Sequence, residues 1–160
     1  MCESSGGKIT KQRLHQYIYL YFETENQRAR FAERLARMKS AECFPSAPEG
    51  EGGGSGQPNP NRMQDAIVRR LAYEEKMFAK IESMEAEMEE IEEAIDRLRN
   101  PLEREVLRLR YTKINAGNKH TPWAVVAKKI YGNDEEKDVL ATHRLHGRAL
   151  VSISKIKTRE

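Results

Sequence analysis

Long hydrophobic runs, aromatic residues and cysteines are all scarce in this sequence of 160 residues. No apolar stretch approaches the roughly 20 residues that span a bilayer, so we expect no membrane-spanning segment. The N-terminal residues MCESSGGK lack the hydrophobic core of a signal peptide, which predicts a cytoplasmic protein. Only 7% of the residues are aromatic and β-branched runs are few, and both features argue against an all-β fold.

Residues that bind metals or perform catalysis are equally sparse. The two cysteines, Cys2 and Cys43, form no C-x-x-C pair, which excludes a zinc ribbon or a redox motif. The four histidines are scattered along the sequence, and His143 and His146 have no carboxylate or cysteine at matching spacing on their helix face. The sequence contains no G-x-S-x-G, P-loop, H-E-x-x-H or G-x-G-x-x-G motif. It therefore predicts a protein that is not an enzyme and that holds no metal or cofactor.

Charge, by contrast, is abundant and unevenly distributed. Residues 62–100 contain 7 basic and 11 acidic side chains, a net charge of −4, whereas residues 101–160 contain 13 and 7, a net charge of +6. An acidic middle followed by a basic end predicts a scaffold joined to a segment that binds a polyanion. A solvated charged surface is the alternative explanation of the same distribution.

Two long helices separated by a linker are predicted for the first hundred residues. Residues 10–39 lack Pro and Gly and carry apolar residues at three- and four-residue steps, although the stretch ETENQRAR interrupts this stripe, so the helix either bends or divides there. Residues 44–61 contain four prolines and five glycines, which predicts a disordered linker. Residues 62–99 read as one helix with a strict heptad seam. The seam consists of Met77, Ile81, Met84, Met88, Ile91, Ile95 and Leu98.

Such a seam predicts helix–helix packing, and its partner is either the helix at 10–39 folding back or a second copy of the chain. We therefore predict an all-α protein with two parts. Residues 8–99 form a helical hairpin or coiled-coil scaffold, and residues 100–160 form a separate C-terminal domain.

Helix-start and helix-stop signals divide this C-terminal domain into three helices. The first helix is predicted to begin after Asn100, which serves as its cap, with Pro101 at the first helical position and Glu103 completing a capping box. This helix runs to about residue 112 and buries Leu102. The other residues expected inside are Val106, Leu107, Leu109, Trp123, Val126, Ala127, Ile130, Leu145, Ala149, Leu150, Ile153 and Ile156.

The second and third helices have start and stop signals of their own. Thr121 and Pro122 open the second helix, and Gly132 ends it in the left-handed conformation. Asn133 or Asp134 caps the third helix, whose first turn is acidic as the helix dipole favours, and which runs to about residue 157.

A short second helix, a turn and a basic third helix outline a helix-turn-helix domain that binds double-stranded DNA. The core holds the third helix so that its exposed face fits the major groove. The base-reading candidates on that face are His143, Arg144, Gly147 and Arg148. The phosphate-contact candidates are Lys119, His120, Thr121, Lys128, Lys129, Lys155 and Lys157. We expect Trp123 in the core, His146 against a helix or at the surface, and Arg104 and Arg108 on a solvated face.

The C-terminal segments also resemble a known family. IDRLRNPLEREVLRLRY, TPWAVVAKKIYG and HRLHGRAL are similar to phage and prophage transcriptional regulators of the RinA/ArpU type, which have a helix-turn-helix like region 4 of sigma-70 factors. The matching residues are Arg110, Tyr111, Trp123, Ala127, Arg144, Leu145, His146, Ala149 and Leu150. The resemblance implies control of late or packaging genes, promoter DNA and host RNA polymerase as partners, and a helical leader that forms homo-oligomers.

Two features depart from the family pattern. Residues 132–139 make a longer and more acidic turn, and Val139, Leu140 and Ala141 stand where polar base readers are expected. Either these apolar side chains contact thymine methyl groups or the register of the third helix is shifted. Two other functions remain open: the small DNA-recognition subunit of a phage packaging terminase, and a helical adaptor that binds protein alone.

Overall fold

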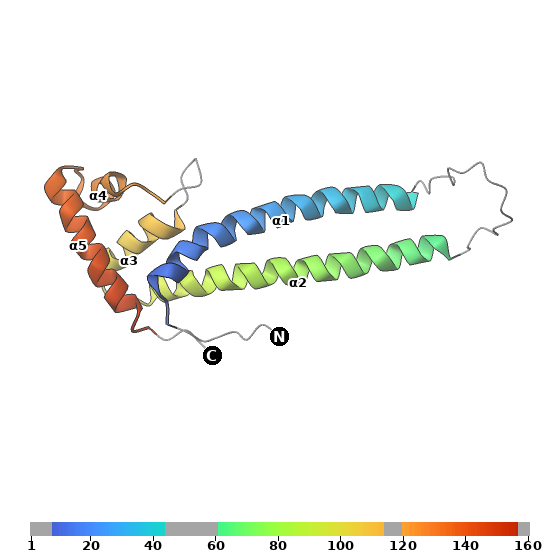
Figure 1. Cartoon of the computed structure of the whole chain (residues 1–160), viewed down its shortest axis with the longest axis horizontal. Helices are drawn as coiled ribbons and strands as arrows, with labels where there is room; N and C mark the ends of the chain where they lie inside the picture. The colour runs from blue at the N-terminus through green and yellow to red at the C-terminus, as the bar shows by residue number, and fades with distance from the viewer. Residues whose placement is uncertain (1–7, 44–60, 114–119, 157–160) are drawn as a thin grey trace. The chain divides into compact units, whose positions relative to one another are not determined.

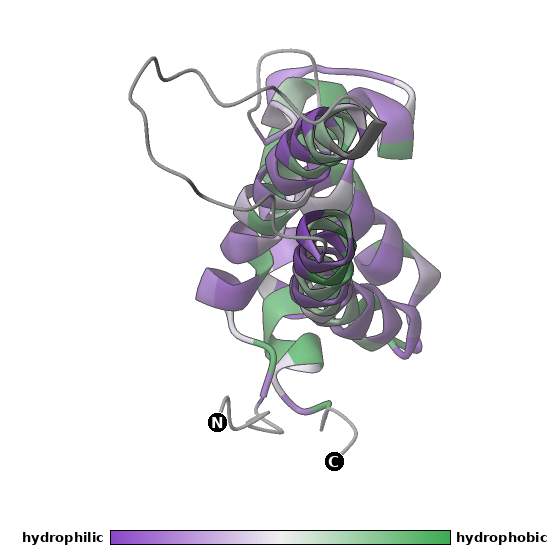
Figure 2. Cartoon of the chain, turned by 90° about the vertical axis from the view of Figure 1, so that its right-hand side faces the viewer, coloured by the Kyte–Doolittle hydropathy of each residue, from purple (hydrophilic) through white to green (hydrophobic). Residues whose placement is uncertain are grey.

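The computed structural model describes residues 8–43, 61–113 and 120–156, and these residues form helices and connections without any strand. The elements in chain order are α1 (Lys11–Cys43), α2 (Arg62–Asp96), α3 (Pro101–Leu107), the π-helical turn η1 (Arg108–Thr112), α4 (Trp123–Tyr131) and α5 (Glu136–Ile153) (Figure 1). The predicted all-α class is confirmed. Each helix carries hydrophilic as well as hydrophobic residues (Figure 2), and none that is described is long and apolar enough to span a bilayer.

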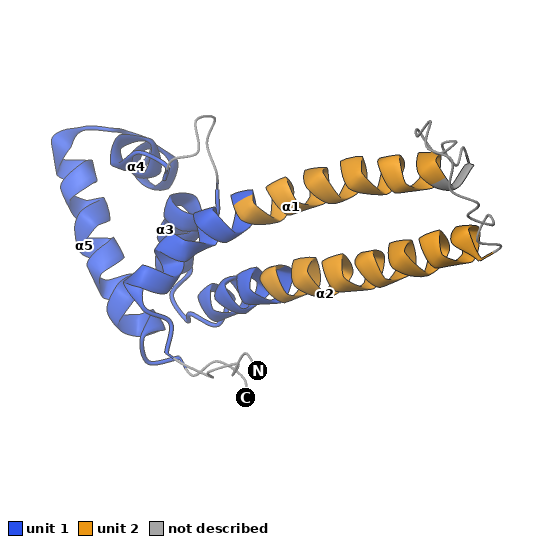
Figure 3. Ribbon diagram, turned by 45° about the vertical axis from the view of Figure 1, so that its right-hand side comes forward, with its two compact units in different colours: residues 1–22, 85–160 blue, residues 23–84 orange. Residues whose placement is uncertain are grey.

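The chain divides into two compact units (Figure 3). Unit 1 comprises residues 1–22 and 85–160, and unit 2 comprises residues 23–84. Both α1 and α2 therefore contribute to each unit, and the predicted division between residues 99 and 100 falls inside unit 1. Of the predicted linker, only Asn61, in the turn before α2, is among the described residues.

The core of unit 1 draws on every helix in it. Its buried apolar residues are Ile9, Leu14, Tyr17, Ile91, Ala94, Ile95, Leu98, Val106, Leu107, Leu109, Tyr111, Val126, Leu145, Ala149 and Ile153. Trp123, Ile130, Leu150 and Ile156 are partly buried against them, as expected of core-facing residues. Leu102 was predicted inside and is 47% exposed, because the start of α3 turns it to solvent and buries the neighbouring Glu103 instead.

The heptad seam of α2 is buried in both units. Ile91, Ile95 and Leu98 are buried in unit 1, and Met77 and Ile81 in unit 2, while Met84 and Met88 are partly covered. In unit 1 the seam packs in the same core as Leu14 and Tyr17 of α1. In unit 2 the Phe31 ring of α1 contacts the rings of Tyr73 and Phe78 of α2. Within the chain, α1 is therefore a partner of this seam.

The interrupted stretch of α1 neither divides nor ends the helix, which is continuous from Lys11 to Cys43. Thr24 and Gln27 occupy buried positions there in place of apolar residues. The amide of Gln27 donates a hydrogen bond to Glu23 Oε1 at 2.6 Å, which satisfies its polar group within the helix. A repeating pattern of apolar residues does not reveal a buried position that is occupied by a polar side chain.

Two of the predicted boundary signals are confirmed. Asn100 caps α3, because its side-chain oxygen accepts a hydrogen bond from the backbone N–H of Leu102 at 3.0 Å, with Pro101 following it. Gly132 ends α4 with a φ of +82°, a conformation that only glycine adopts without cost. The backbone N–H of Gly132 bonds to the carbonyl of Lys128 at 3.0 Å and closes the last turn.

Two other boundary predictions are wrong. Thr121 does not cap α4, because its hydroxyl donates to the carbonyl of Lys113 at 3.1 Å and Pro122 occupies the cap position. Neither Asn133 nor Asp134 caps α5, which begins at Glu136 after Glu135 and ends at Ile153. The extent predicted for the helix from Pro101 to about residue 112 is confirmed, because α3 ends at Leu107 and the π-helical turn η1 continues directly to Thr112.

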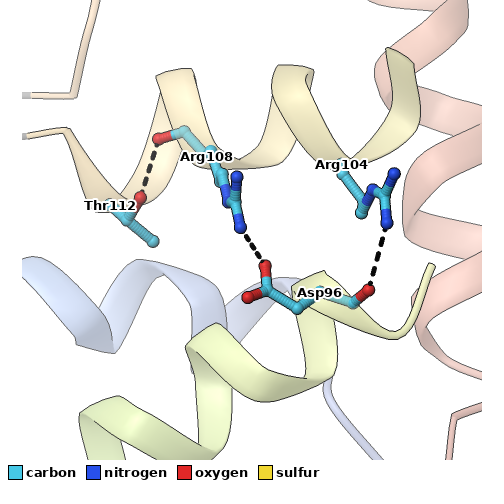
Figure 4. Close-up of polar contacts among 4 residues, drawn as sticks. All are labelled: Asp96, Arg104, Arg108 and Thr112. Carbon is cyan, nitrogen blue, oxygen red and sulfur yellow. Dashed lines mark hydrogen bonds and ion pairs between the residues drawn. The ribbon is translucent and has the colours of Figure 1, made fainter. Parts of the chain in front are cut away.

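The end of α2 and the helix after it are tied together by one acidic residue (Figure 4). The carboxylate of Asp96 forms an ion pair with Arg108. The backbone carbonyl of Asp96 accepts a 3.5 Å hydrogen bond from the guanidinium of Arg104. Thr112 bonds back to the carbonyl of Arg108 at 3.0 Å, within the π-helical turn. Arg108 is exposed, as expected, Arg104 is partly buried, and both contact Asp96 at the end of α2.

The cap of α3 provides a direct test of this fold. Asn100→Ala is expected to lower the free energy of unfolding by about 1 kcal/mol, because the N–H of Leu102 loses its acceptor. Asn100→Asp keeps an acceptor oxygen at the same place and should retain most of the stability. Urea denaturation of both variants measures the difference, and equal losses would show that the side-chain bond does not stabilise α3.

Candidate nucleic-acid interface

The helices α4 and α5 contact each other and are joined by only four residues, 132–135. The predicted long turn is therefore wrong, because α5 begins within the acidic stretch that was assigned to the turn. Glu136 and Asp138 lie in the first helical turn, where the helix dipole favours negative side chains. A turn of this length between two packed helices is typical of helix-turn-helix proteins.

One face of α5 is buried and the opposite face is exposed. The buried residues are Thr142, Leu145, His146, Ala149 and Ile153, which pack against α3 and α4. The exposed stripe consists of Lys137, Leu140, Arg144, Gly147, Arg148 and Val151. These positions recur at three- and four-residue steps over about 21 Å of helix at 1.5 Å per residue. We call them the α5 stripe.

The structure brings three of the four base-reading candidates together. Arg144, Gly147 and Arg148 line one open hollow of about 790 Å³, which Glu103 borders from α3. His143 is also exposed but lies at the edge of the stripe, where its ring is 4.4 Å from that of Trp123. Two guanidinium groups and a glycine on one exposed helix face form a surface that donates hydrogen bonds and allows close approach.

The phosphate-contact candidates fall into three groups. Lys128, Lys129 and Lys155 are exposed and remain available for a ligand. Thr121 is 1% exposed and His120 is half-buried, and both side chains have hydrogen-bond partners within unit 1. Lys119 and Lys157 lie outside the described residues.

Of the exposed side chains of the α5 stripe, Lys137 was missed as a candidate, and Leu140 was considered only as a contact for a thymine methyl group. Lys137 stands in the first turn and forms a 2.8 Å ion pair with Glu135, and Leu140 is 51% exposed one turn later. In helix-turn-helix proteins the first residues of the recognition helix contact base edges. Val139 and Ala141 are only partly exposed. The start of α5 at Glu136 was the missing information, because it sets which side of the helix each residue occupies.

Arg110 and Trp123 connect η1 to the start of α4. The guanidinium of Arg110 donates a hydrogen bond to the carbonyl of Thr121 and lies 4.4 Å from the centre of the Trp123 ring. The Trp123 ring in turn contacts the rings of His143 and His146 of α5. Several of the residues that carry the family resemblance therefore meet in space, and their contacts position α5 rather than expose a ligand-binding group.

All four histidines of the sequence converge around Tyr111 and Trp123, although they are distant in the chain. The hydroxyl of Tyr111 is hydrogen-bonded to Nε2 of His146 at 2.9 Å, and Tyr111 also contacts the rings of His15 and His120. Nδ1 of His15 lies 2.6 Å from Nε2 of His120, so at most one of these two nitrogens carries a proton. We call this set the histidine cluster.

The surroundings of His15, His120 and His146 favour neutral imidazoles. Burial, aided by the positive charges of Lys11 and Arg110, lowers the pKa of His146 to about 4. Burial also lowers the pKa of His15 and that of His120, with positive neighbours acting in the same direction. Among the described residues, no group of three or more His, Cys, Asp or Glu side chains is placed to hold a metal ion.

Comparison with family models, with curated proteins and with solved structures finds no match to this chain.

Proposed function

We propose that this chain is a sequence-specific transcriptional regulator that binds double-stranded DNA through the α5 stripe. The observation that supports this most strongly is the combination of a four-residue turn between α4 and α5 with an exposed stripe that carries Lys137, Arg144 and Arg148. The opposite face of α5 is buried, so the core presents the stripe in a fixed orientation. The major groove of B-DNA is wide enough to admit such a helix.

Three residues of the α5 stripe and three exposed lysines outside it have different roles in this proposal. Arg144, near the middle of α5, donates a bidentate pair of hydrogen bonds to a guanine, and Gly147 allows the groove edge to approach closely. Leu140 contacts a thymine methyl group. Lys128, Lys129 and Lys155 contact phosphates and set the register on the duplex without selecting a sequence.

The remaining features of the proposed regulator rest on the family resemblance. We propose that α3 to α5 form a sigma region 4-like domain, and that α1 and α2 form a helical hairpin that oligomerises the protein or contacts host RNA polymerase. The target genes are the late or packaging genes of a phage. The contacts of α1 with the buried seam of α2 support the hairpin.

The role of Arg144 is tested by its removal. Arg144→Ala is expected to weaken binding to the preferred duplex by about 1–3 kcal/mol, which is roughly 5- to 150-fold in Kd. Binding to a duplex of unrelated sequence should change much less, because a base contact is lost rather than a phosphate contact. Fluorescence anisotropy on both duplexes at about 150 mM salt measures the two effects.

Arg62→Ala serves as the matched control, because it removes an exposed arginine from the start of α2, outside the α5 stripe. It should leave both affinities nearly unchanged. An equal loss on both duplexes for Arg144→Ala would identify Arg144 as a phosphate contact. No loss on either duplex would remove Arg144 from the interface.

A further inference from the structure

Unit 2 contains a second concentration of positive charge, separate from the α5 stripe. A groove of about 580 Å³ runs between α1 and α2 in this unit. Its cations are Arg30, Arg34 and Arg37 on α1 and Lys76 and Lys80 on α2, and Glu33 is the acidic residue that lines it. Residues 23–84 carry ten basic and ten acidic side chains, so the unit as a whole is neutral. Positive charge is therefore concentrated locally in this groove.

Most of these cations have no acidic partner among the residues that the structure describes. Arg37 pairs with Glu33 at 3.3 Å, whereas Arg30, Arg34, Lys76 and Lys80 form no ion pair with any residue that the structure describes. Arg34 lies 4.5 Å from the centre of the Tyr73 ring. Stacking on an aromatic ring orients a guanidinium and leaves its N–H groups free to bind an anion.

The cations form two rows along the groove. Arg30, Arg34 and Arg37 follow steps of four and three residues, which places them about 6 and 4.5 Å apart along one side of α1. Lys76 and Lys80 are four residues apart on α2. Two parallel rows of positive charge match an extended polyanion with regularly spaced charges better than they match a single small ion.

We propose that this groove binds the phosphate backbone of a nucleic acid duplex, in addition to the contact made by the α5 stripe. The proposal goes beyond the function assigned to α5 and does not depend on it, because phosphate binding selects no sequence and uses a different unit. Arginine is well suited to this role, since its planar guanidinium forms paired hydrogen bonds with phosphate oxygens.

An acidic segment of a second copy is the competing occupant, and part of the acidic run of α2 is already paired within its own chain. Three residues of the acidic run of α2 have partners within their own chain: Glu90 pairs with Arg13, Glu92 accepts from Tyr17, and Glu93 pairs with Arg97 at 2.8 Å. These contacts would compete with binding of the same residues in the groove of another copy. A nucleic acid backbone brings unpaired charges instead.

The test compares two double variants of the full chain that lose the same charge. Arg30→Gln with Lys80→Gln removes one cation from each wall of the groove, and Lys39→Gln with Arg62→Gln removes two exposed cations outside it. Binding of a duplex of arbitrary sequence is measured between 50 and 250 mM NaCl (roughly the range in which phosphate contacts are resolved). Sedimentation velocity gives the mass of each variant at the same concentrations.

The proposal predicts that the groove variant lowers the slope of log Kd against log salt by about two, because each lost phosphate contact contributes about 0.9. The control should keep the wild-type slope, and all masses should agree. Equal slopes for the two variants would overturn the proposal. A lower mass for the groove variant would also overturn it, since the groove would then hold a second copy.

A second measurement covers the case in which the groove variant does not fold. Lys76 and Lys80 of the wild-type protein are acetylated in the presence and absence of saturating duplex, and the modification is quantified by mass spectrometry. Protection of both lysines relative to Lys39 is expected. Unchanged acetylation of Lys76 and Lys80 would overturn the proposal.

Discussion

Leu145→Ala is expected to lower the free energy of unfolding by about 2–5 kcal/mol, the usual cost of removing a fully buried leucine side chain. Leu145 is 1% exposed and lies on the buried face of α5, in the core that α3 and α4 share. The truncation leaves a cavity between these helices, which cannot close without moving α5. Urea denaturation followed by far-UV circular dichroism measures the change.

Leu140→Ala is the matched control, because it makes the same chemical change on the same helix at a residue that is 51% exposed. It should change the stability by less than about 0.5 kcal/mol. Its effect should appear in DNA binding, where Leu140 is proposed to contact a thymine methyl group. Similar stability losses for the two variants would contradict the assignment of the buried and exposed faces of α5.

The free energy of unfolding is expected to fall steeply as the pH is lowered from 6.5 to 4. His146 has a pKa of about 4 in the folded protein, against about 6.5 in the unfolded chain. The unfolded chain therefore binds the proton more readily than the folded one. The contribution of His146 is fully present above pH 6.5 and is lost as the pH falls toward 4. From this shift, the loss amounts to about 3 kcal/mol.

The first structural reason is that protonation of His146 would place a charge in a buried site, and the second is that its surroundings are already positive. Lys11 and Arg110 already act on His146, as do His143 and His15. His15 and His120 add to the effect in the same direction, since burial and positive neighbours lower the pKa of each in the folded protein. Protonation of His146 would thus weaken the contacts that this residue of α5 makes with Tyr111 and Trp123.

Comparison with a variant isolates His146 from the carboxylates that also titrate in this range. His146→Gln removes the titrating group but keeps a side chain that hydrogen-bonds to Tyr111. The dependence of its unfolding free energy on pH between 6.5 and 4 should be shallower than that of the wild type by up to about 1.4 kcal/mol per pH unit. Parallel curves for the two proteins would show that His146 does not titrate as its burial implies.

Features of the fold that depend on local chemistry were predictable from the sequence. The heptad spacing identified the buried face of α2, from Met77 to Leu98, because a helix places every third and fourth residue on one side. Asn100 and Gly132 marked the start of α3 and the end of α4, since a cap needs a specific acceptor and a left-handed residue favours glycine.

Other features depend on contacts between distant residues and could not be predicted in this way. The sequence position of Thr121 suggests a helix cap, but its hydroxyl donates to the carbonyl of Lys113. Pro122 occupies the cap position, and α4 begins at Trp123. The histidine cluster forms only because the start of α1 packs beside η1 and α5 in unit 1. Likewise, the groove of unit 2 needs cations from two helices, which appear in the sequence as separate scattered charges.

The candidate interface was predicted in part for the same reasons. Arg144, Gly147 and Arg148 were identified because their spacing places them opposite the apolar residues of the same helix. Lys137 was missed because it was assigned to the turn. Where a helix begins depends on which backbone groups find partners, and here the carbonyl of Glu135 accepts the first helical bond from Val139 at 3.0 Å, without help from a side-chain cap.

The central claim, that the α5 stripe reads DNA sequence, is tested most directly by selection from a pool of randomised duplexes. The full chain and an Arg144→Ala, Arg148→Ala variant are each carried through several rounds at about 150 mM salt, and the bound duplexes are sequenced. The proposal predicts that the wild type enriches one motif and that the variant enriches none, while both still retain some duplex at low salt. Enrichment of the same motif by both proteins, or of no motif by the wild type, would contradict the claim.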